Sequence, residues 1–265
     1  MTRPVALNYT VRGEGRPLVL LHGLYGSAGN LNRFAKHFAE RYRVIAPDLR
    51  NHGHSPHHPR MDYPAMAADI AALLDAEGEA SAAVVGHSMG GKVAMALALA
   101  EPRRVDAVVA ADIAPVAYQH GHATLVATMR GIDVAAASSR GEVDAALAKG
   151  VESQAVRQFL LKNLAPDPGG GYRWRIPLDI LSGAVSVIEG FPDLEGGYPG
   201  PALFVYGERS GYFDADRDGA RTRALFPAAE LVMLRETGHW LHAERPEEFA
   251  AALDRFFARH YPAGG

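Results

Sequence analysis

The stretch AAVVGHSMGGKVAMALA, residues 82–98, decides the fold of this chain. A short apolar run ends at Val85, a Gly-x-Ser-x-Gly turn follows, and an alanine-rich run typical of a helix continues to residue 98. Strand, sharp turn and helix in this order form a nucleophile elbow, with Ser88 at its tip. Gly86 and Gly90 carry no Cβ, so they fit where such a turn brings chain segments close together.

A nucleophilic Ser88 is the interpretation that this setting favours. The helix that begins after Ser88 directs its positive end toward the serine, so the Met89 N–H is a candidate oxyanion donor. The alternative is a tight strand-to-helix turn with a buried serine. A phosphate-binding loop is disfavoured, because neither Gly-x-Gly-x-x-Gly nor Gly-x4-Gly-Lys-Ser/Thr occurs in the chain.

Apolar runs on either side of this stretch predict a mostly parallel sheet. Continuous runs suit strands that are buried on both faces, and they occupy residues 17–22, 42–47, 105–111, 201–207 and 230–234. Residues 5–11 alternate in polarity and predict an antiparallel edge strand. Apolar residues recur at helical intervals from Met66 onward and again from Phe249 onward, which predicts two amphipathic helices. This alternation predicts an α/β fold with helices on both faces of the sheet.

Residues 113–198 interrupt the alternation. They contain no convincing strand, but Val156, Phe159, Leu160 and Leu164 share one face of an amphipathic stretch. We expect a helical cap here, inserted into a core formed by residues 1–112 and 199–265. Phe159, Leu160, Trp174 and Trp240 either line an apolar pocket or pack within the cap.

Composition excludes several classes of function. The chain has 265 residues, a net charge of -3 and no long basic run, so nothing favours nucleic acid or an anionic membrane as a partner. No apolar run is long enough to span a bilayer, and no signal peptide is evident, so a cytoplasmic location is expected. Cysteine is absent, which excludes disulfides, thiolate metal sites and a cysteine nucleophile.

A loop that follows the run 17–22 predicts the second oxyanion donor. It reads His22-Gly23-Leu24-Tyr25 and lies at the carboxyl edge of the predicted sheet, where α/β folds bind ligands. The Leu24 N–H is the candidate donor, and Tyr25 is expected to line the acyl pocket. The alternative is a helix-entry loop with Ser27 or Asn30 as the cap.

The base is sought among 12 histidines. Gly238-His239 follows the last predicted strand, so His239 can reach the serine and be oriented by an acid. His242 is expected to point into the helix junction. His52, His54, His57 and His58 could form a metal cluster, but without ordered spacing or nearby carboxylates a solvated loop with a turn at Gly53 is favoured. His120 and His122 are interpreted as pocket rim.

An ordered set of motifs resembles the α/β-hydrolase superfamily from end to end. The set is HGLYGS, DLRNHGHS, GHSMGG and GHWLHAE. GHSMGGKVAM, DIAPV and the cap sequence RQFLLKNL…YRWRIPLDIL are similar to the YbfF-type esterases and their eukaryotic abhydrolase-domain relatives. The resemblance implies the α/β-hydrolase fold and a serine hydrolase, with Ser88 and His239 as nucleophile and base.

The acid departs from the common pattern of this superfamily. The turn after the strand 201–207 reads Gly207-Glu208-Arg209-Ser210, so a serine stands where an aspartate is usual. Asp112 ends the buried run 105–111 and needs a polar partner there. The YbfF-type resemblance also implies an acid in this Asp-Ile-x-Pro context, so Asp112 is the candidate. Asp214 and Asp216 remain alternatives, as does an N-cap role for Asp112.

The predicted activity is hydrolysis of small acyl esters or acyl thioesters through an acyl-enzyme on Ser88, with Tyr25, His87 and Trp240 at the substrate. No metal and no cofactor is required. One alternative is another Ser-His-Asp reaction, such as carbon–carbon bond hydrolysis or perhydrolysis. Another is a non-catalytic ligand sensor on the same scaffold.

Overall fold

The computed structural model describes residues 3–118, 121–194 and 196–264. Within these residues a seven-stranded sheet has the order β1-β3-β2-β4-β5-β8-β9. The strands are β1 Tyr9–Arg12, β2 Pro17–Leu21, β3 Arg43–Pro47, β4 Ala82–His87, β5 Val105–Ala111, β8 Ala202–Gly207 and β9 Ala229–Leu234. β1 pairs antiparallel with β3 at one edge, and the other neighbours are parallel. The predicted mostly parallel sheet and its antiparallel edge strand are confirmed.

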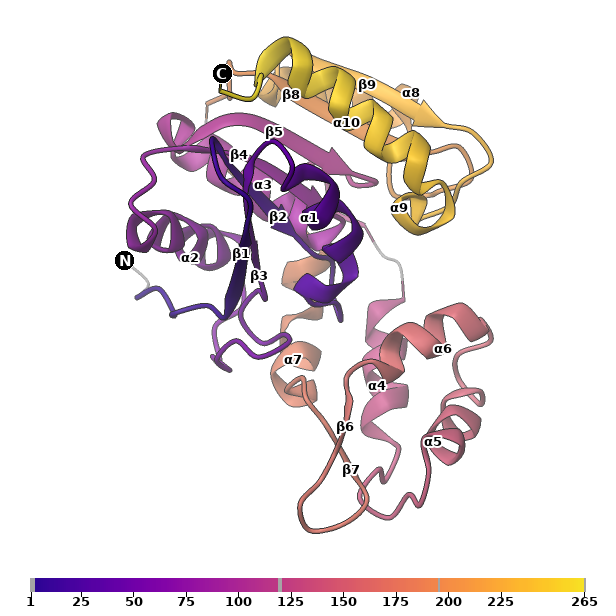
Figure 1. Cartoon of the computed structure of the whole chain (residues 1–265). Helices are drawn as coiled ribbons and strands as arrows, with labels where there is room; N and C mark the ends of the chain where they lie inside the picture. The colour runs from indigo at the N-terminus through magenta and orange to yellow at the C-terminus, as the bar shows by residue number, and fades with distance from the viewer. Residues whose placement is uncertain (1–2, 119–120, 195, 265) are drawn as a thin grey trace.

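Helices cover both faces of this sheet (Figure 1). Alternate residues of each strand serve different faces: Leu18 and Leu20 of β2 pack with one core cluster, Val19 and Leu21 with the other. The first cluster contains side chains of α1 (Asn32–Phe38) and α10 (Pro246–His260). The second contains side chains of α2 (Tyr63–Ala76), α3 (Met89–Ala100) and α8 (Ala215–Leu225).

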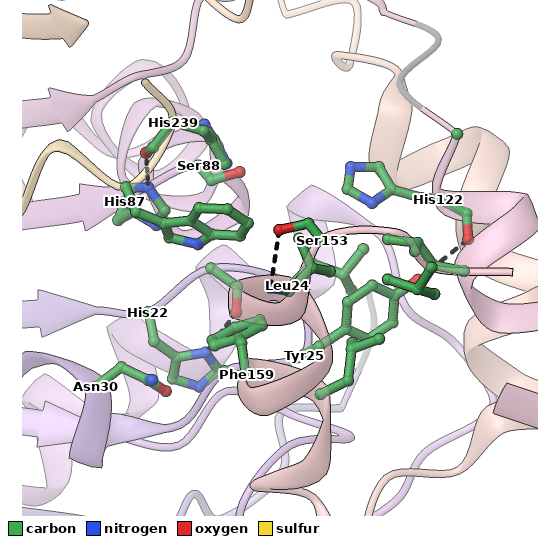
Figure 2. A pocket seen from close by; sticks show the side chains of 18 of the residues that line it. His22, Leu24, Tyr25, Asn30, His87, Ser88, His122, Ser153, Phe159 and His239 are labelled. Carbon is green, nitrogen blue, oxygen red and sulfur yellow. Dashed lines mark hydrogen bonds between the residues drawn. The ribbon is translucent and has the colours of Figure 1, made fainter. Parts of the chain in front are cut away.

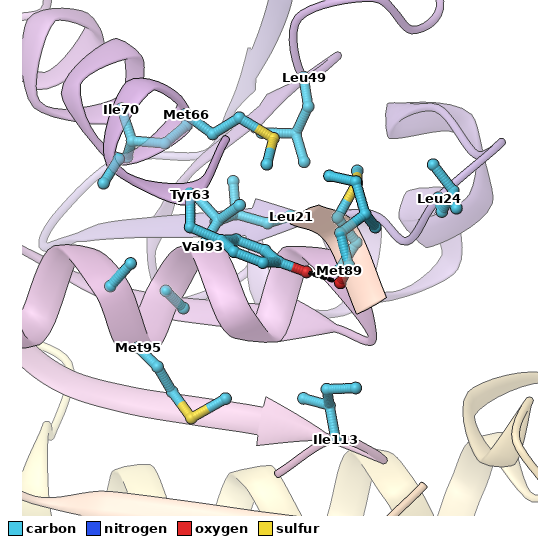
Figure 3. Packing of buried hydrophobic residues seen from close by; sticks show 14 of the residues in the cluster. Leu21, Leu24, Leu49, Tyr63, Met66, Ile70, Met89, Val93, Met95 and Ile113 are labelled. Atoms are coloured by element: carbon cyan, nitrogen blue, oxygen red, sulfur yellow. Dashed lines mark hydrogen bonds between the residues drawn. The ribbon is translucent and has the colours of Figure 1, made fainter. Parts of the chain in front are cut away.

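The second cluster packs against α3, the helix that follows Ser88. Figure 3 shows Met66 and Ile70 of α2 facing Val93 of α3, with Leu21 of the sheet beside them. These side chains are almost completely buried. Truncating buried side chains that are packed in this way costs several kcal/mol of stability, so the start of α3 is held firmly against the sheet.

The segment between β5 and β8 lies to one side of the sheet (Figure 1). We call residues 113–198 the insertion. It holds α4 (His122–Arg130), α5 (Arg140–Leu147), α6 (Gln154–Leu161) and α7 (Leu178–Glu189). The expectation that it contains no strand is wrong: β6 (Leu164–Pro166) and β7 (Tyr172–Trp174) form an antiparallel hairpin. These strands have three residues each, too few to show a periodic pattern.

Shorter elements complete the chain. They are the 3₁₀ helices η1 (Ala28–Leu31) and η2 (Pro102–Arg104), and the short helix α9 (Leu241–Glu244). Among the described residues, no helix combines the length and the hydropathy that a membrane crossing needs.

Candidate active site

Ser88 occupies the sharp turn between β4 and α3. Its backbone angles are φ 53° and ψ −119°, a strained conformation for a residue with a side chain. The close approach predicted for the two glycines is present: a Cβ on Gly86 would lie 2.1 Å from the Gly90 carbonyl oxygen. A Cβ on Gly90 would lie 2.5 Å from the Leu21 oxygen. Larger side chains at either position would push Ser88 out of the turn.

Asp112 and His239 form a hydrogen-bonded pair beside this turn. Asp112 follows the last residue of β5 and is completely buried. The Nδ1 of His239 lies 2.7 Å from its Oδ2, so Nδ1–H donates to the carboxylate and Nε2 is left without this proton. The Gly207 N–H also donates to Oδ1 of Asp112, at 2.9 Å, and the Ser210 hydroxyl donates to Oδ2. The buried carboxylate is therefore well satisfied.

The competing acids have other partners. Asp214 is exposed and caps α8, where its side chain accepts from the N–H groups of Asp216 and Arg217, both at 2.9 Å. Asp216 is exposed in the first turn of the same helix. Asp112 is therefore the carboxylate that the structure brings to His239, in place of the aspartate that the β8 turn lacks.

The loop after β2 lies against the elbow. A Cβ on Gly23 would stand 3.4 Å from the Cβ of Ser88, so the adjoining Leu24 N–H is close to the serine. Within the described residues, neither the Leu24 N–H nor the Met89 N–H donates to a protein acceptor. Ser27 and Asn30 form a capping box for η1, so this loop also has the helix-entry role that the sequence left open.

Two buried histidines hold this loop in place. His52 Nε2 accepts the Tyr25 N–H at 3.0 Å, which helps to hold Tyr25 at its unusual φ of 62°. His22 Nε2 accepts the Leu49 N–H at 3.0 Å. Burial lowers the pKa of His52 to about 3 and lowers that of His22, so both rings are neutral acceptors. Each ring's Nδ1 donates to a backbone carbonyl.

The interpretation of residues 50–60 as a solvated loop is therefore wrong in part. Arg50 is buried and pairs with Asp69 at 2.6 Å, and Asn51, His52 and Gly53 are buried beside it. His54 and His57 are exposed, as expected. In the parts of the chain that the structure describes, no three His, Asp or Glu side chains are grouped to hold a metal ion.

His87 and His242 pack behind His239. The His87 ring lies 4.7 Å from that of His239 and 4.3 Å from that of His242. Its Nε2–H donates to the His239 carbonyl at 2.8 Å, so His87 braces the loop that carries the base. Burial lowers the pKa of His87 to about 3 and puts that of His242 well below its usual value. Both are neutral, so they do not repel the imidazolium that forms on His239 during proton transfer.

A cavity of about 580 Å³ opens above Ser88 and His239. Figure 2 shows side chains of the β2 loop, the elbow and the insertion around it. Tyr25, His87, Trp240, Phe159 and Leu160 line it, as does His122. Trp174 does not, because it lies on the β6–β7 hairpin. His120 lies outside the described residues.

Two residues here were not expected from the sequence. The ring of Tyr212 stacks on that of His239, with centroids 3.7 Å apart and planes 18° apart. Lys92, one turn after Ser88, is buried and donates to the carbonyls of Glu189 and Gly190 at 3.1 and 2.5 Å. Tyr212 lies outside the motifs that the sequence analysis used, so no sequence pattern predicted its place beside His239. Lys92 stood within GHSMGGK, but buried lysines look like solvated ones in a sequence.

A family model described as the alpha/beta hydrolase fold matches residues 16–246. This chain belongs to the α/β-hydrolase family. The resemblance stated from the motifs is thereby confirmed, together with the fold class that it implied.

Relatives of similar length narrow the place of this α/β hydrolase within the family. An sn-1-specific diacylglycerol lipase, ABHD11 of Danio rerio, is 38% identical over 96% of this chain and 83% of its own. Esterase YbfF of Escherichia coli is 37% identical over 91% of this chain and 92% of its own. A solved marine microorganism esterase has a TM-score of 0.92 and 36% identity, and the match covers 95% of this chain and 99% of that one.

Proposed function

We propose that this α/β hydrolase cleaves carboxylic esters by a serine mechanism. The observation that carries the proposal is the Asp112–His239 pair, 2.7 Å from Oδ2 to Nδ1, in a cavity that both His239 and Ser88 line. The family and the relatives named esterase and lipase support the same reaction class.

The proposed steps follow from these positions. His239 Nε2 takes the Ser88 proton while Ser88 Oγ attacks the acyl carbon, and the N–H groups of Leu24 and Met89 hold the oxyanion. The same proton passes from His239 to the leaving alcohol. Water, activated by His239, then releases the acid from the acyl-enzyme. Asp112 keeps the His239 tautomer and offsets its positive charge.

We propose that the insertion acts as the cap that the sequence predicted over residues 113–198. Phe159, Leu160 and Val156 of α6 support this, because they add apolar walls to the cavity. An apolar wall suits the hydrocarbon part of an acyl group. Substrates with long chains, among them the diacylglycerols named for the ABHD11 relatives, are thus candidates, and so are acyl thioesters. The cytoplasmic location stays a prediction.

Active-site labelling tests the proposal. A fluorophosphonate should add one adduct mass to the intact protein and abolish hydrolysis of a p-nitrophenyl acyl ester. Ser88→Ala should prevent the adduct and lower kcat on the order of 10⁵-fold or more, with its unfolding curve retained. A Ser88→Ala protein that keeps most of its activity would show that another group is the nucleophile.

A matched set of substrates separates ester hydrolysis from carbon–carbon bond cleavage and from ligand binding without turnover. The same acyl groups are offered as oxygen esters, as coenzyme A thioesters and as carbon–carbon-linked diketones. Turnover of the esters with none of the diketones supports ester hydrolysis over carbon–carbon bond cleavage. A fluorophosphonate adduct without turnover of any of them would favour a ligand sensor.

A further inference from the structure

A second hollow adjoins the cavity that contains Ser88. It has a volume of about 610 Å³ and runs between η1–α1, α6 and α9. Neither Ser88 nor His239 lines it, but it shares Asn30, Phe159, Trp240 and His242 with the cavity. We call it the outer groove. The rings of Phe159 and Trp240, 6.2 Å apart, stand where the two spaces meet.

The outer groove is mainly apolar. Beyond the shared residues its walls include Phe34, Ala155, Ala243 and Pro246. Two of its charged residues have partners within the protein: Arg33 pairs with Glu247, and Glu244 accepts the Gly238 N–H at 2.8 Å. Gln158 of α6 and Lys162, which directly follows α6, supply the other polar groups. A surface of this kind suits a hydrocarbon chain with a polar end better than a charged ligand.

The chemistry of the proposed reaction decides which half of an ester can lie there. The C–O bond of the ester breaks as the Ser88–acyl bond forms, and the leaving oxygen takes the proton from His239. The alcohol therefore leaves on the histidine side of the serine. Trp240 and α9 follow His239 directly in the chain, and Trp240, His242 and Ala243 form one wall of the outer groove.

The acyl chain has a different place. Because the carbonyl oxygen must face the N–H groups of Leu24 and Met89, we assign the acyl chain to the part of the cavity that α4 and α6 line. Thr124 and Leu125 of α4 and Val156 of α6 line that cavity and are absent from the walls of the outer groove.

We infer that the outer groove binds the hydrocarbon chain of the leaving alcohol. This inference rests on the proposed ester hydrolysis and narrows its substrates to esters with an apolar chain on both sides of the ester bond. Diacylglycerols and long-chain alkyl esters belong to this class. Methyl and ethyl esters would leave the outer groove empty and lose its contribution to binding.

Filling each space separately tests the assignment. Ala155 is exposed on α6 and lines the outer groove but not the cavity, so Ala155→Trp narrows the groove alone. Gln154→Trp is the matched control, because Gln154 is an exposed neighbour that lines neither space. Thr124→Trp, at an exposed position of α4, narrows the cavity.

Two series of esters are compared, one with a fixed acyl group and methyl to decyl alcohols, the other with methanol and acetyl to decanoyl groups. Ala155→Trp should lower the ratio of kcat/KM for decyl over methyl esters roughly tenfold or more, and Gln154→Trp should keep it. Thr124→Trp should lower the decanoyl-over-acetyl ratio instead. The assignment would be overturned if folded Ala155→Trp changed the decanoyl-over-acetyl ratio instead of the decyl-over-methyl ratio, or if it changed neither ratio.

A binding measurement keeps this inference separate from the proposed activity. Trp240 and Trp174 are the two tryptophans of the chain, so Trp174→Phe leaves Trp240 as the fluorescent reporter. In Ser88→Ala/Trp174→Phe protein, decanol should change the fluorescence saturably, and adding Ala155→Phe, which narrows the groove without adding a tryptophan, should weaken this binding roughly tenfold or more. No saturable change would overturn the inference. If wild-type protein cleaves no ester yet decanol binds in this way, the proposed function fails and the groove assignment stands.

Discussion

Ser210 donates its hydroxyl hydrogen to Oδ2 of Asp112, the same oxygen that accepts Nδ1–H from His239. The turn that commonly supplies the acid in this family thus supplies a second donor to an acid on the neighbouring strand. Gly207, at the end of β8, donates to the other oxygen of Asp112. Donors to both oxygens of this buried carboxylate fix its direction.

Asp112→Asn should reduce kcat for p-nitrophenyl esters by about 10⁴-fold, because the amide no longer fixes the His239 tautomer or offsets its charge. Asp214→Asn is the matched control. Asparagine also caps helices well, so this variant should keep both its activity and its melting temperature. Steady-state kinetics of the two proteins decide the assignment, and a large loss in Asp214→Asn alone would reverse it.

The acid should be movable between the two strands. In the double variant Asp112→Asn/Ser210→Asp, the new carboxylate comes from the turn whose hydroxyl already reaches the position of Oδ2. We expect the double variant to regain at least about tenfold in kcat over Asp112→Asn, about 1.4 kcal/mol. Ser210→Asp alone should lose activity, because two carboxylates then compete for one histidine. A double variant no better than Asp112→Asn would show that the β8 turn cannot present an acid to His239.

Much of the fold and part of the candidate site follow from local patterns in the sequence. Periodicity and the ordered motifs were enough for the sheet, for both helix layers and for the positions of Ser88 and His239, because each of these depends on local patterns. The role of Asp112 could be predicted because a charged residue at the end of a buried strand requires a polar partner.

The rest depended on contacts between segments distant in sequence. Tyr212 stacks on His239 and His52 accepts from Tyr25, and neither pair has a spacing that a sequence pattern marks. The sequence predicted a solvated loop over residues 50–60. Part of this loop is buried instead, because Arg50 forms a buried ion pair with Asp69 of α2, and a pair so distant in sequence leaves no local pattern. The β6–β7 hairpin was missed because short strands carry little periodic signal.

As the pH is lowered, the protein should unfold at a higher pH than protonation of its carboxylates alone would predict. His52 and His87 have pKa values lowered to about 3 by burial, and burial lowers those of His22 and His242 as well. The unfolded chain binds protons on these rings below about pH 6.5 and the folded chain does not, so the free energy of unfolding falls as the pH decreases from about 6.5 toward 3.

Urea unfolding across this pH range measures the effect. His87→Gln, whose amide can still donate to the His239 carbonyl, should give a shallower dependence on pH. His54→Gln is the control, because His54 is exposed. Equal slopes for wild-type protein and His87→Gln would contradict the neutral state that burial imposes on His87.

Lys92 should contribute to stability although burial lowers its pKa to about 7. Its Nζ satisfies two carbonyls at the carboxyl end of α7 and lies 4.5 Å from the centre of the Tyr118 ring. Lys92→Met keeps the length of the side chain but removes its hydrogen bonds to both carbonyls, of which the Glu189 carbonyl keeps the Tyr118 N–H. We therefore expect a loss of about 2 kcal/mol in the free energy of unfolding. Lys36→Met, at an exposed lysine, should change it by less than about 0.5 kcal/mol.

Asp112 immediately precedes the insertion, and this sets a rule for building chimeras in this family. An exchange of insertions with a relative whose acid lies on the β8 turn would replace the insertion and, if the first crossover fell before residue 112, remove the acid as well. Crossovers placed after Ala114 would exchange the insertion while leaving Asp112 and its hydrogen bond to His239 in place. Recombination libraries cut at that junction should therefore contain many more active members than libraries cut two or three residues earlier.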